Sequence, residues 1–136
     1  MNKQDEFLDD FQRTLVQWCV NMFGPKCARD PKERGLRLLE EALEAAQAVN
    51  VSQEDAHKLV DYVFGRPTGE ISQEVSGVLV TVLTLAASVG ISAELSLVRE
   101  IARIHEPGFR EKIRAKHNTK ELAGVSIHPV AIELEQ

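Results

Sequence analysis

The sequence contains only two cysteines, Cys19 and Cys27, among its 136 residues. Two cysteines are too few for a disulfide scaffold, so we expect both to be reduced thiols in a cytoplasmic protein. A zinc site is not predicted either, because the four histidines show neither HxxxH nor Cys-His spacing. Glycine-rich phosphate loops and Ser-His-Asp constellations are also missing, which removes two common routes to phosphate binding and acyl transfer.

An excess of positive charge is lacking as well, since the formal net charge is −5. This balance argues against general binding to nucleic acid or to anionic membranes. The longest apolar stretch, residues 75–89, is shorter than a membrane span and includes serine, threonine and glycine. We therefore expect it to be a buried helix and expect no membrane partner. The polar start of the chain, without the apolar run of a signal peptide, adds to the expectation of a cytoplasmic protein.

Helical periodicity is the signal that the sequence does carry. Apolar residues recur at three- and four-residue spacing, and strand patterns are absent. The predicted fold class is therefore all-α, a helical bundle of about five helices. The expected helices cover residues 4–22, residues 31–49, a shorter stretch after Ser52, residues 70–89, and a stretch from Ser92 to the break at Pro107-Gly108.

Local sequence signals define most of the ends of the expected helices. Asp30, Ser52 and Ser92 are N-cap candidates, and Gly24-Pro25 is expected to end the first helix. The basic segment 109–118 is left open as a possible further helix. We expect one all-α domain over residues 1–118 and a C-terminal arm over residues 119–136 that is flexible or packs on a partner subunit.

Two groups of acidic residues lie on separate predicted helices: Glu40, Glu41 and Glu44 on one, Glu70 and Glu74 on the other. Like charges at i,i+3 and i,i+4 repel by a few tenths of a kcal/mol, roughly, on an exposed helix. A hard divalent cation such as Mg²⁺, or Mn²⁺, would turn that repulsion into binding, because it prefers several oxygen ligands. The alternative is a solvated acidic face without a ligand.

The sequence around these acids resembles the motifs of a known family. Leu39-Glu40-Glu41-Ala42-Leu43-Glu44, followed by Gln73-Glu74-Val75-Ser76-Gly77, is similar to the Glu-Glu-x-x-Glu and Glu-x-x-Asp motifs of the MazG-like all-α nucleoside triphosphate pyrophosphohydrolases. Phe23-Gly24-Pro25, Glu33-Arg34 and the run from Ala56 to Pro67 fit its phage and proteobacterial group. The resemblance implies a Mg²⁺-dependent enzyme that releases pyrophosphate from a canonical or modified nucleoside triphosphate. It also implies a homodimer or tetramer.

The resemblance assigns roles to individual residues. Glu41, Glu44 and Glu74 match the metal-binding positions, whereas Gly77 stands where the family has aspartate. Glu70 is the nearest replacement for that aspartate and Asp61 a second one. Either Glu40 or Glu41 would orient or deprotonate the attacking water. Candidate substrate-binding residues are Arg66, Lys112, Arg114, Lys116 and Asn118.

Two other functions remain open at this stage. One is a catalytically impaired MazG-like protein that binds a nucleotide or a protein partner, as Gly77 suggests. The other is a helical regulatory module whose acidic face is only solvated.

Overall fold

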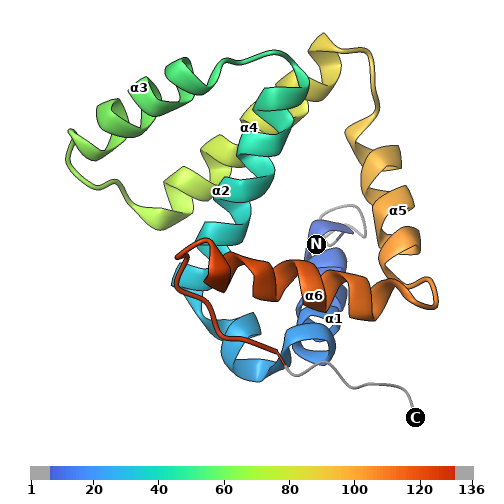
Figure 1. The fold of residues 1–136 in the computed structure, drawn as a ribbon. Helices are drawn as coiled ribbons and strands as arrows, with labels where there is room; N and C mark the ends of the chain where they lie inside the picture. Colours follow the sequence, from blue (N-terminus) through green and yellow to red (C-terminus); the bar gives the residue numbers. More distant parts are fainter. Residues whose placement is uncertain (1–6, 131–136) are drawn as a thin grey trace. The chain divides into compact units, whose positions relative to one another are not determined.

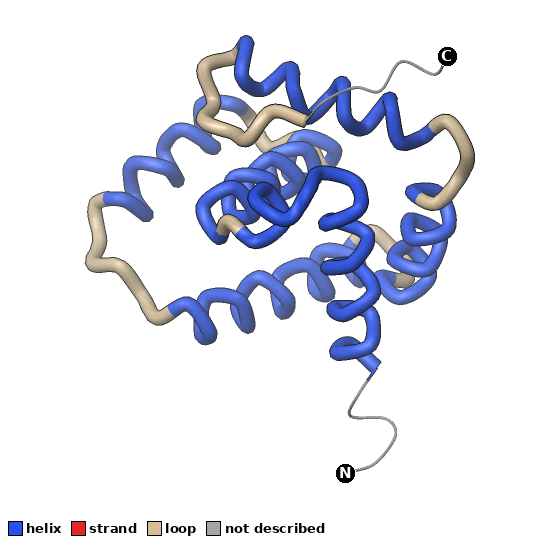
Figure 2. The backbone as a smooth tube through the Cα atoms, turned by 90° about the horizontal axis from the view of Figure 1, so that it is seen from below, coloured by secondary structure: helices blue, strands red, loops and turns tan. Residues whose placement is uncertain are grey.

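The computed structural model of the chain describes residues 7–130, and all regular structure in that range is α-helical. Figure 2 shows these helices joined by loops, with no strand in the described part of the chain. The all-α prediction is confirmed, although the described range holds six helices instead of about five. They are α1 (Phe7–Arg29), α2 (Pro31–Ala48), α3 (Gln53–Phe64), α4 (Ile71–Ser88), α5 (Ala93–Ile104) and α6 (Phe109–Leu122). The additional helix is α6, which contains the basic segment that the pattern left open.

The chain divides into two compact units. The first consists of Met1–Ala42 and Pro107–Gln136, and the second of Leu43–Glu106. The first unit thus contains α1, the larger part of α2 and α6. The second contains the end of α2 together with α3, α4 and α5.

The core of the first unit forms where α1 packs against α6 (Figure 1). Its buried apolar residues are Cys19, Met22 and Cys27. Trp18 and Phe23 meet edge to face with ring centroids 5.8 Å apart, a favourable aromatic geometry. Buried polar side chains lie in the same unit, which places hydrogen bonding and electrostatics at its centre; they are Glu33, Arg114 and His117.

Helix α1 is interrupted by Gly24, whose φ of 81° and ψ of 162° are not helical. Glycine accepts this positive φ without a Cβ clash. The prediction that Gly24-Pro25 ends the helix is only partly right, because a second helical stretch resumes at Pro25 and continues to Arg29. Pro25 has no N–H, so the Asn21 carbonyl lacks its usual helical donor. Arg110 and Arg114 of α6 donate to that carbonyl instead, at 3.2 and 3.3 Å.

The predicted N-caps are confirmed. Asp30 Oδ1 accepts the backbone N–H of Lys32 at 3.0 Å, at the start of α2. Ser52 Oγ and Ser92 Oγ accept the N–H groups three residues ahead of them, at 3.1 and 3.2 Å. Each cap satisfies a donor that a helix start otherwise leaves unpaired. Local sequence therefore determines where α2, α3 and α5 begin.

Helix α4 packs against α5 in the second unit, yet only Ala86 along it is buried. The prediction of a buried helix is therefore wrong for the chain as described. By length and composition alone, α4 is the one helix among the described residues that could cross a membrane. Large apolar side chains are exposed on α4 and on the neighbouring helices of the second unit; they include Leu59, Val63, Phe64, Ile71, Val75, Leu79, Val80, Leu83, Leu95 and Val98.

The segment after α6 returns to its own unit. Asn118 Nδ2 donates to the Val130 carbonyl at 2.7 Å, and the Val130 N–H donates to Asn118 Oδ1 at 2.9 Å. The His128 N–H donates to Glu33 Oε1 at 2.9 Å. Of the predicted arm, residues 119–122 thus belong to α6, residues up to 130 are held by these bonds, and residues 131–136 lie outside the described range.

Candidate functional site

Glu40 of α2 is held by cations. Its carboxylate lies 2.9 Å from Arg37 Nη1 on the preceding turn and 3.0 Å from Lys120 Nζ of α6. Partial burial acts to raise the pKa of Glu40, but the hydrogen bonds from Arg37 and Lys120 outweigh it and lower the pKa below its usual value. Glu40 is therefore a stable anion, better suited to orienting a water than to holding a proton.

Glu41 and Glu44 lie on the exposed part of the same helix. Glu41 forms an ion pair with Arg37, the helical partner four residues before it. Leu38, Leu39 and Leu43 are nearly half exposed between and beside these acids. Carboxylates and large apolar side chains thus share the surface of one helix.

The two acids of α4 both lie at its N-terminus. Glu70 is the N-cap, and its carboxylate accepts the backbone N–H groups of Ser72 at 3.1 Å and Gln73 at 3.0 Å. These hydrogen bonds lower the pKa of Glu70. The Glu74 carboxylate turns back toward Gly69, so closely that a Cβ on residue 69 would lie 2.0 Å from Glu74 Oε1. Glycine at position 69 leaves the space that this carboxylate takes.

Gly77, the position of the missing aspartate, has open space around it. A Cβ built there meets no heavy atom within 4 Å, apart from the helix's own neighbouring backbone. Close helix packing within the described chain therefore does not account for this glycine. Asp61, the second suggested replacement, is an exposed residue of α3. Arg66 follows that helix and stacks over the Tyr62 ring, with its guanidinium carbon 4.4 Å from the ring centroid.

The predicted phosphate-binding residues of α6 have different surroundings. Lys112 is exposed, and Lys116 is exposed with its Nζ 3.9 Å from Glu40 Oε1. Arg114 is buried and donates from Nε to the Met22 carbonyl at 2.7 Å. Asn118 makes its two hydrogen bonds to the backbone of Val130. The two lysines are exposed, whereas Arg114 and Asn118 hold backbone groups of their own unit.

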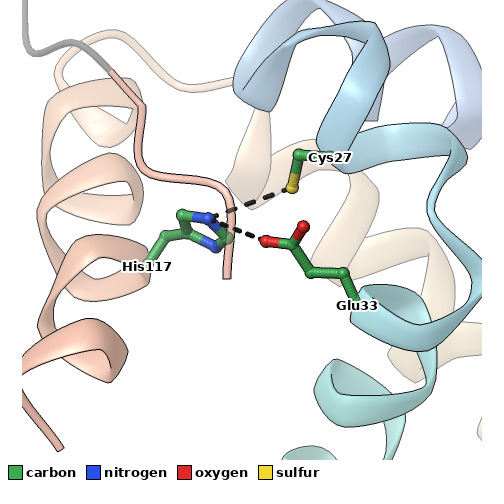
Figure 3. A group of neighbouring side chains, drawn as sticks. All are labelled: Cys27, Glu33 and His117. Carbon is green, nitrogen blue, oxygen red and sulfur yellow. Dashed lines mark hydrogen bonds and ion pairs between the residues drawn. The ribbon is translucent and has the colours of Figure 1, made fainter. Parts of the chain in front are cut away.

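Sequence reasoning missed a buried group of Cys27, Glu33 and His117 (Figure 3). His117 Nε2 lies 3.3 Å from Glu33 Oε1 and 3.9 Å from Cys27 Sγ. The three residues come from α1, α2 and α6, and 90 positions separate Cys27 from His117. No local spacing could have indicated the group, because only the packing of α1 against α6 brings its ends together.

Arg34 flanks the two cysteines. Its guanidinium donates to Cys19 Sγ at 3.3 Å and to Cys27 Sγ at 3.0 Å, and both cysteines are free thiols, as predicted. Burial raises the pKa of Cys27 to about 12, with Arg34 opposing the rise and the Glu33 carboxylate adding to it. Without a cation in place, the Cys27 sulfur therefore carries its proton.

Comparisons of the chain with family models, with curated proteins and with solved structures find no match.

Proposed function

We propose that the protein is a Mg²⁺-dependent nucleoside triphosphate pyrophosphohydrolase of the MazG-like kind that works as a homodimer or tetramer. Glu41, Glu44, Glu70 and Glu74 are the residues that would hold Mg²⁺, with Mn²⁺ as a substitute. The substrate would be a canonical or modified nucleoside triphosphate, and the protein would act in the cytoplasm.

The observation that carries this proposal is the pairing of carboxylates with uncovered apolar surface. On α2, Glu41 and Glu44 lie among leucines that are nearly half exposed. On α4, Glu70 is the N-cap and Glu74 lies in the first turn of an apolar helix that is almost entirely exposed. A second copy that covered the apolar side chains would also remove water from the acids. Carboxylates that lose water need a countercharge, and a hard divalent cation supplies it.

The chemistry follows from the ligand type. The four carboxylates would hold Mg²⁺, which would supply positive charge to offset the negative charge that develops as a phosphoanhydride is cut. The stable anion of Glu40, or Glu41 beside it, would orient the attacking water. Lys112 and Lys116 are exposed cations on α6, and Arg66 is a further candidate for the phosphates. Arg114 and Asn118 would support these groups through the backbone contacts described above.

A nucleotide panel tests the activity. The protein is incubated with Mg²⁺ and each nucleoside triphosphate, and pyrophosphate and monophosphate are measured by ion chromatography. We expect release from at least one nucleotide, and its loss in Glu44→Gln with an unchanged melting temperature. Glu94→Gln is the matched control, because Glu94 is also an exposed helical glutamate. Absence of product from every nucleotide, together with no Mg²⁺ binding by calorimetry, would refute the enzyme.

A catalytically impaired relative is the second candidate. Two observations favour it: Gly77 offers no carboxylate, and the Glu70 carboxylate is engaged as the N-cap of α4. Such a protein would bind a nucleotide or a protein partner without turnover. Calorimetric binding of a non-hydrolysable triphosphate, combined with no pyrophosphate release from the hydrolysable one, would support this function over hydrolysis.

The assembly has its own test. Light scattering on the full chain should give at least twice the mass of one chain, 15.1 kDa. Leu79→Lys places a charge on the exposed face of α4 and should dissociate the assembly. Elution of the wild type as a monomer would contradict the homo-oligomer. Recovery only in detergent would instead point to a membrane role for α4.

A further inference from the structure

We propose that Cys27, Glu33 and His117 bind a transition-metal ion, with Zn²⁺ as the natural occupant. Their ligand atoms all lie within 4.8 Å of one another. This site lies in the first unit and is independent of the proposed Mg²⁺ site, because it shares no residue with it.

The donor set selects the metal. One sulfur, one imidazole nitrogen and one carboxylate oxygen suit a borderline-soft ion, whereas Mg²⁺ prefers oxygen ligands alone. Zn²⁺ with these three ligands also keeps the charge balanced, since a thiolate and a carboxylate together offset its two positive charges. One coordination position remains for a further donor, such as water or the His128 carbonyl oxygen, which lies 2.9 Å from His117 Nε2.

The spacing fits a tetrahedral ion. With Zn–N and Zn–O near 2.05 Å and Zn–S near 2.3 Å, nitrogen and oxygen ligands lie about 3.4 Å apart, and nitrogen and sulfur about 3.6 Å apart. The corresponding distances here are 3.3 Å between His117 Nε2 and Glu33 Oε1, and 3.9 Å between His117 Nε2 and Cys27 Sγ. These two separations therefore lie within a few tenths of an ångström of the tetrahedral values.

A buried oxygen without a hydrogen bond gives further support. The Glu33 side chain is 3% exposed, and its Oε2 atom makes no hydrogen bond among the described residues; its neighbour is His128 Nε2 at 3.6 Å. In Figure 3 this carboxylate points between Cys27 and His117. A buried carboxylate oxygen without a hydrogen bond costs about 1–3 kcal/mol or more, so a ligand that occupies it would stabilise the fold.

The surroundings already orient the ligands. Arg34 donates to Cys27 Sγ at 3.0 Å, and the His128 N–H donates to Glu33 Oε1 at 2.9 Å. Such donors around the ligands typically account for roughly 10–100-fold in metal affinity. Cys27 is fully buried and His117 is 5% exposed, so the site is closed to substrates. We therefore assign it a structural role that joins α1, α2 and α6.

The alternative to a bound metal ion is a metal-free group in which the side chains keep their protons. His117 Nε2–H would then donate to the His128 carbonyl, and the group would be a hydrogen-bonded network that binds no metal. The two states differ in sulfur chemistry, because only the metal-bound state contains a thiolate ligand. Metal content and sulfur spectroscopy therefore distinguish them.

The test uses the full chain purified without chelator and then loaded with Zn²⁺ or Co²⁺. We expect about one zinc per chain by mass spectrometry, retained in excess Mg²⁺, and a sulfur-to-cobalt charge-transfer band in the Co²⁺ form. Cys27→Ser should lose both, whereas Cys19→Ser, the matched control, should keep them because Cys19 lies outside the group. Arg34→Met should weaken zinc binding by about 10–100-fold while leaving one site per chain.

Two results would overturn the proposal. The first is wild-type protein that binds no more zinc than Cys27→Ser does. The second is Co²⁺-loaded wild type without the charge-transfer band, which shows that the bound ion has no sulfur ligand. This second measurement needs no variant, so it remains decisive even if Cys27→Ser fails to fold. Pyrophosphohydrolase activity is not needed for either readout.

Discussion

Replacement of Arg114 by methionine should destabilise the first unit strongly. The guanidinium is buried and donates to the Met22 carbonyl at 2.7 Å and to the Asn21 carbonyl at 3.3 Å. Methionine fills a similar volume, so the main loss is of these two bonds. Leaving the buried Met22 carbonyl without this donor costs about 1–3 kcal/mol. The Asn21 carbonyl keeps Arg110, so the second loss is smaller, roughly 0.5–1 kcal/mol.

The expected total is therefore about 1.5–4 kcal/mol in the free energy of unfolding. Trp18 is the only tryptophan, and it lies in α1, so its fluorescence reports on this unit. With an m-value of roughly 2 kcal/mol per M, the urea midpoint should fall by about 1–2 M. Lys112→Met on the same helix is the matched control, because Lys112 is exposed and should leave the midpoint unchanged.

The same pair of variants tests the role that the family resemblance gives Arg114. If Arg114→Met left the urea midpoint at its wild-type value and weakened only triphosphate binding, the structural reasoning would be refuted and Arg114 would be a substrate ligand. If Lys112→Met weakened triphosphate binding without changing the midpoint, the exposed lysine would be the phosphate contact.

Two glycines give further predictions. Gly69→Ala would place a Cβ 2.0 Å from Glu74 Oε1, so the flexible Glu74 carboxylate must move while the fold stays intact. We expect weaker Mg²⁺ binding by calorimetry with an unchanged melting temperature, and unaltered Mg²⁺ binding would show that the Glu74 position does not matter for the metal. Gly77→Ala should stabilise α4 by about 0.5–1 kcal/mol, since alanine is the better helix former and the added Cβ meets open space. Dissociation of the oligomer by Gly77→Ala in light scattering would instead show that a partner copy packs closely on this glycine.

The parts of the fold that the sequence predicts are those determined within a few residues. Ser52 and Ser92 cap helices through N–H groups three positions ahead, so their signals are complete in a short window. The end of α1 is different. Gly24-Pro25 correctly marks a break in the hydrogen bonding, but arginines from α6 satisfy the Asn21 carbonyl and a second helical stretch can follow.

Burial is harder to predict, because it depends on what covers an element. The composition of α4 identifies an apolar helix, and apolar helices in a single domain are normally buried. The described chain nevertheless leaves most of α4 exposed, with Ala86 buried and Val78 and Leu85 half-buried. Whether another copy covers it is a property of the assembly, which periodicity along one chain does not encode.

The Cys27–Glu33–His117 group was missed for the opposite reason, since all of its members are in the chain but 90 positions separate Cys27 from His117. Zinc motifs are recognised in sequences by short spacings within a pair of ligands. Here each ligand comes from a different helix, so the sequence shows three unrelated residues. The only local hint lies at Glu33, an acid in the first turn of α2. Its neighbour Arg34 has no acidic residue three or four positions further along the helix.

Both proposed metal sites depend on α2. Helix α6 holds α2 at two places: His117 contacts Glu33 at 3.3 Å, and Lys120, three residues later, pairs with Glu40 at 3.0 Å. Glu33 and Glu40 are about two turns apart on α2, so both contacts lie along one side of the helix. This double attachment fixes the rotation of α2 about its own axis and thereby the direction in which Glu41 projects. An ion at the buried end would strengthen the first attachment, so a site for a borderline-soft metal would stabilise the helix that carries two of the proposed oxygen ligands of Mg²⁺.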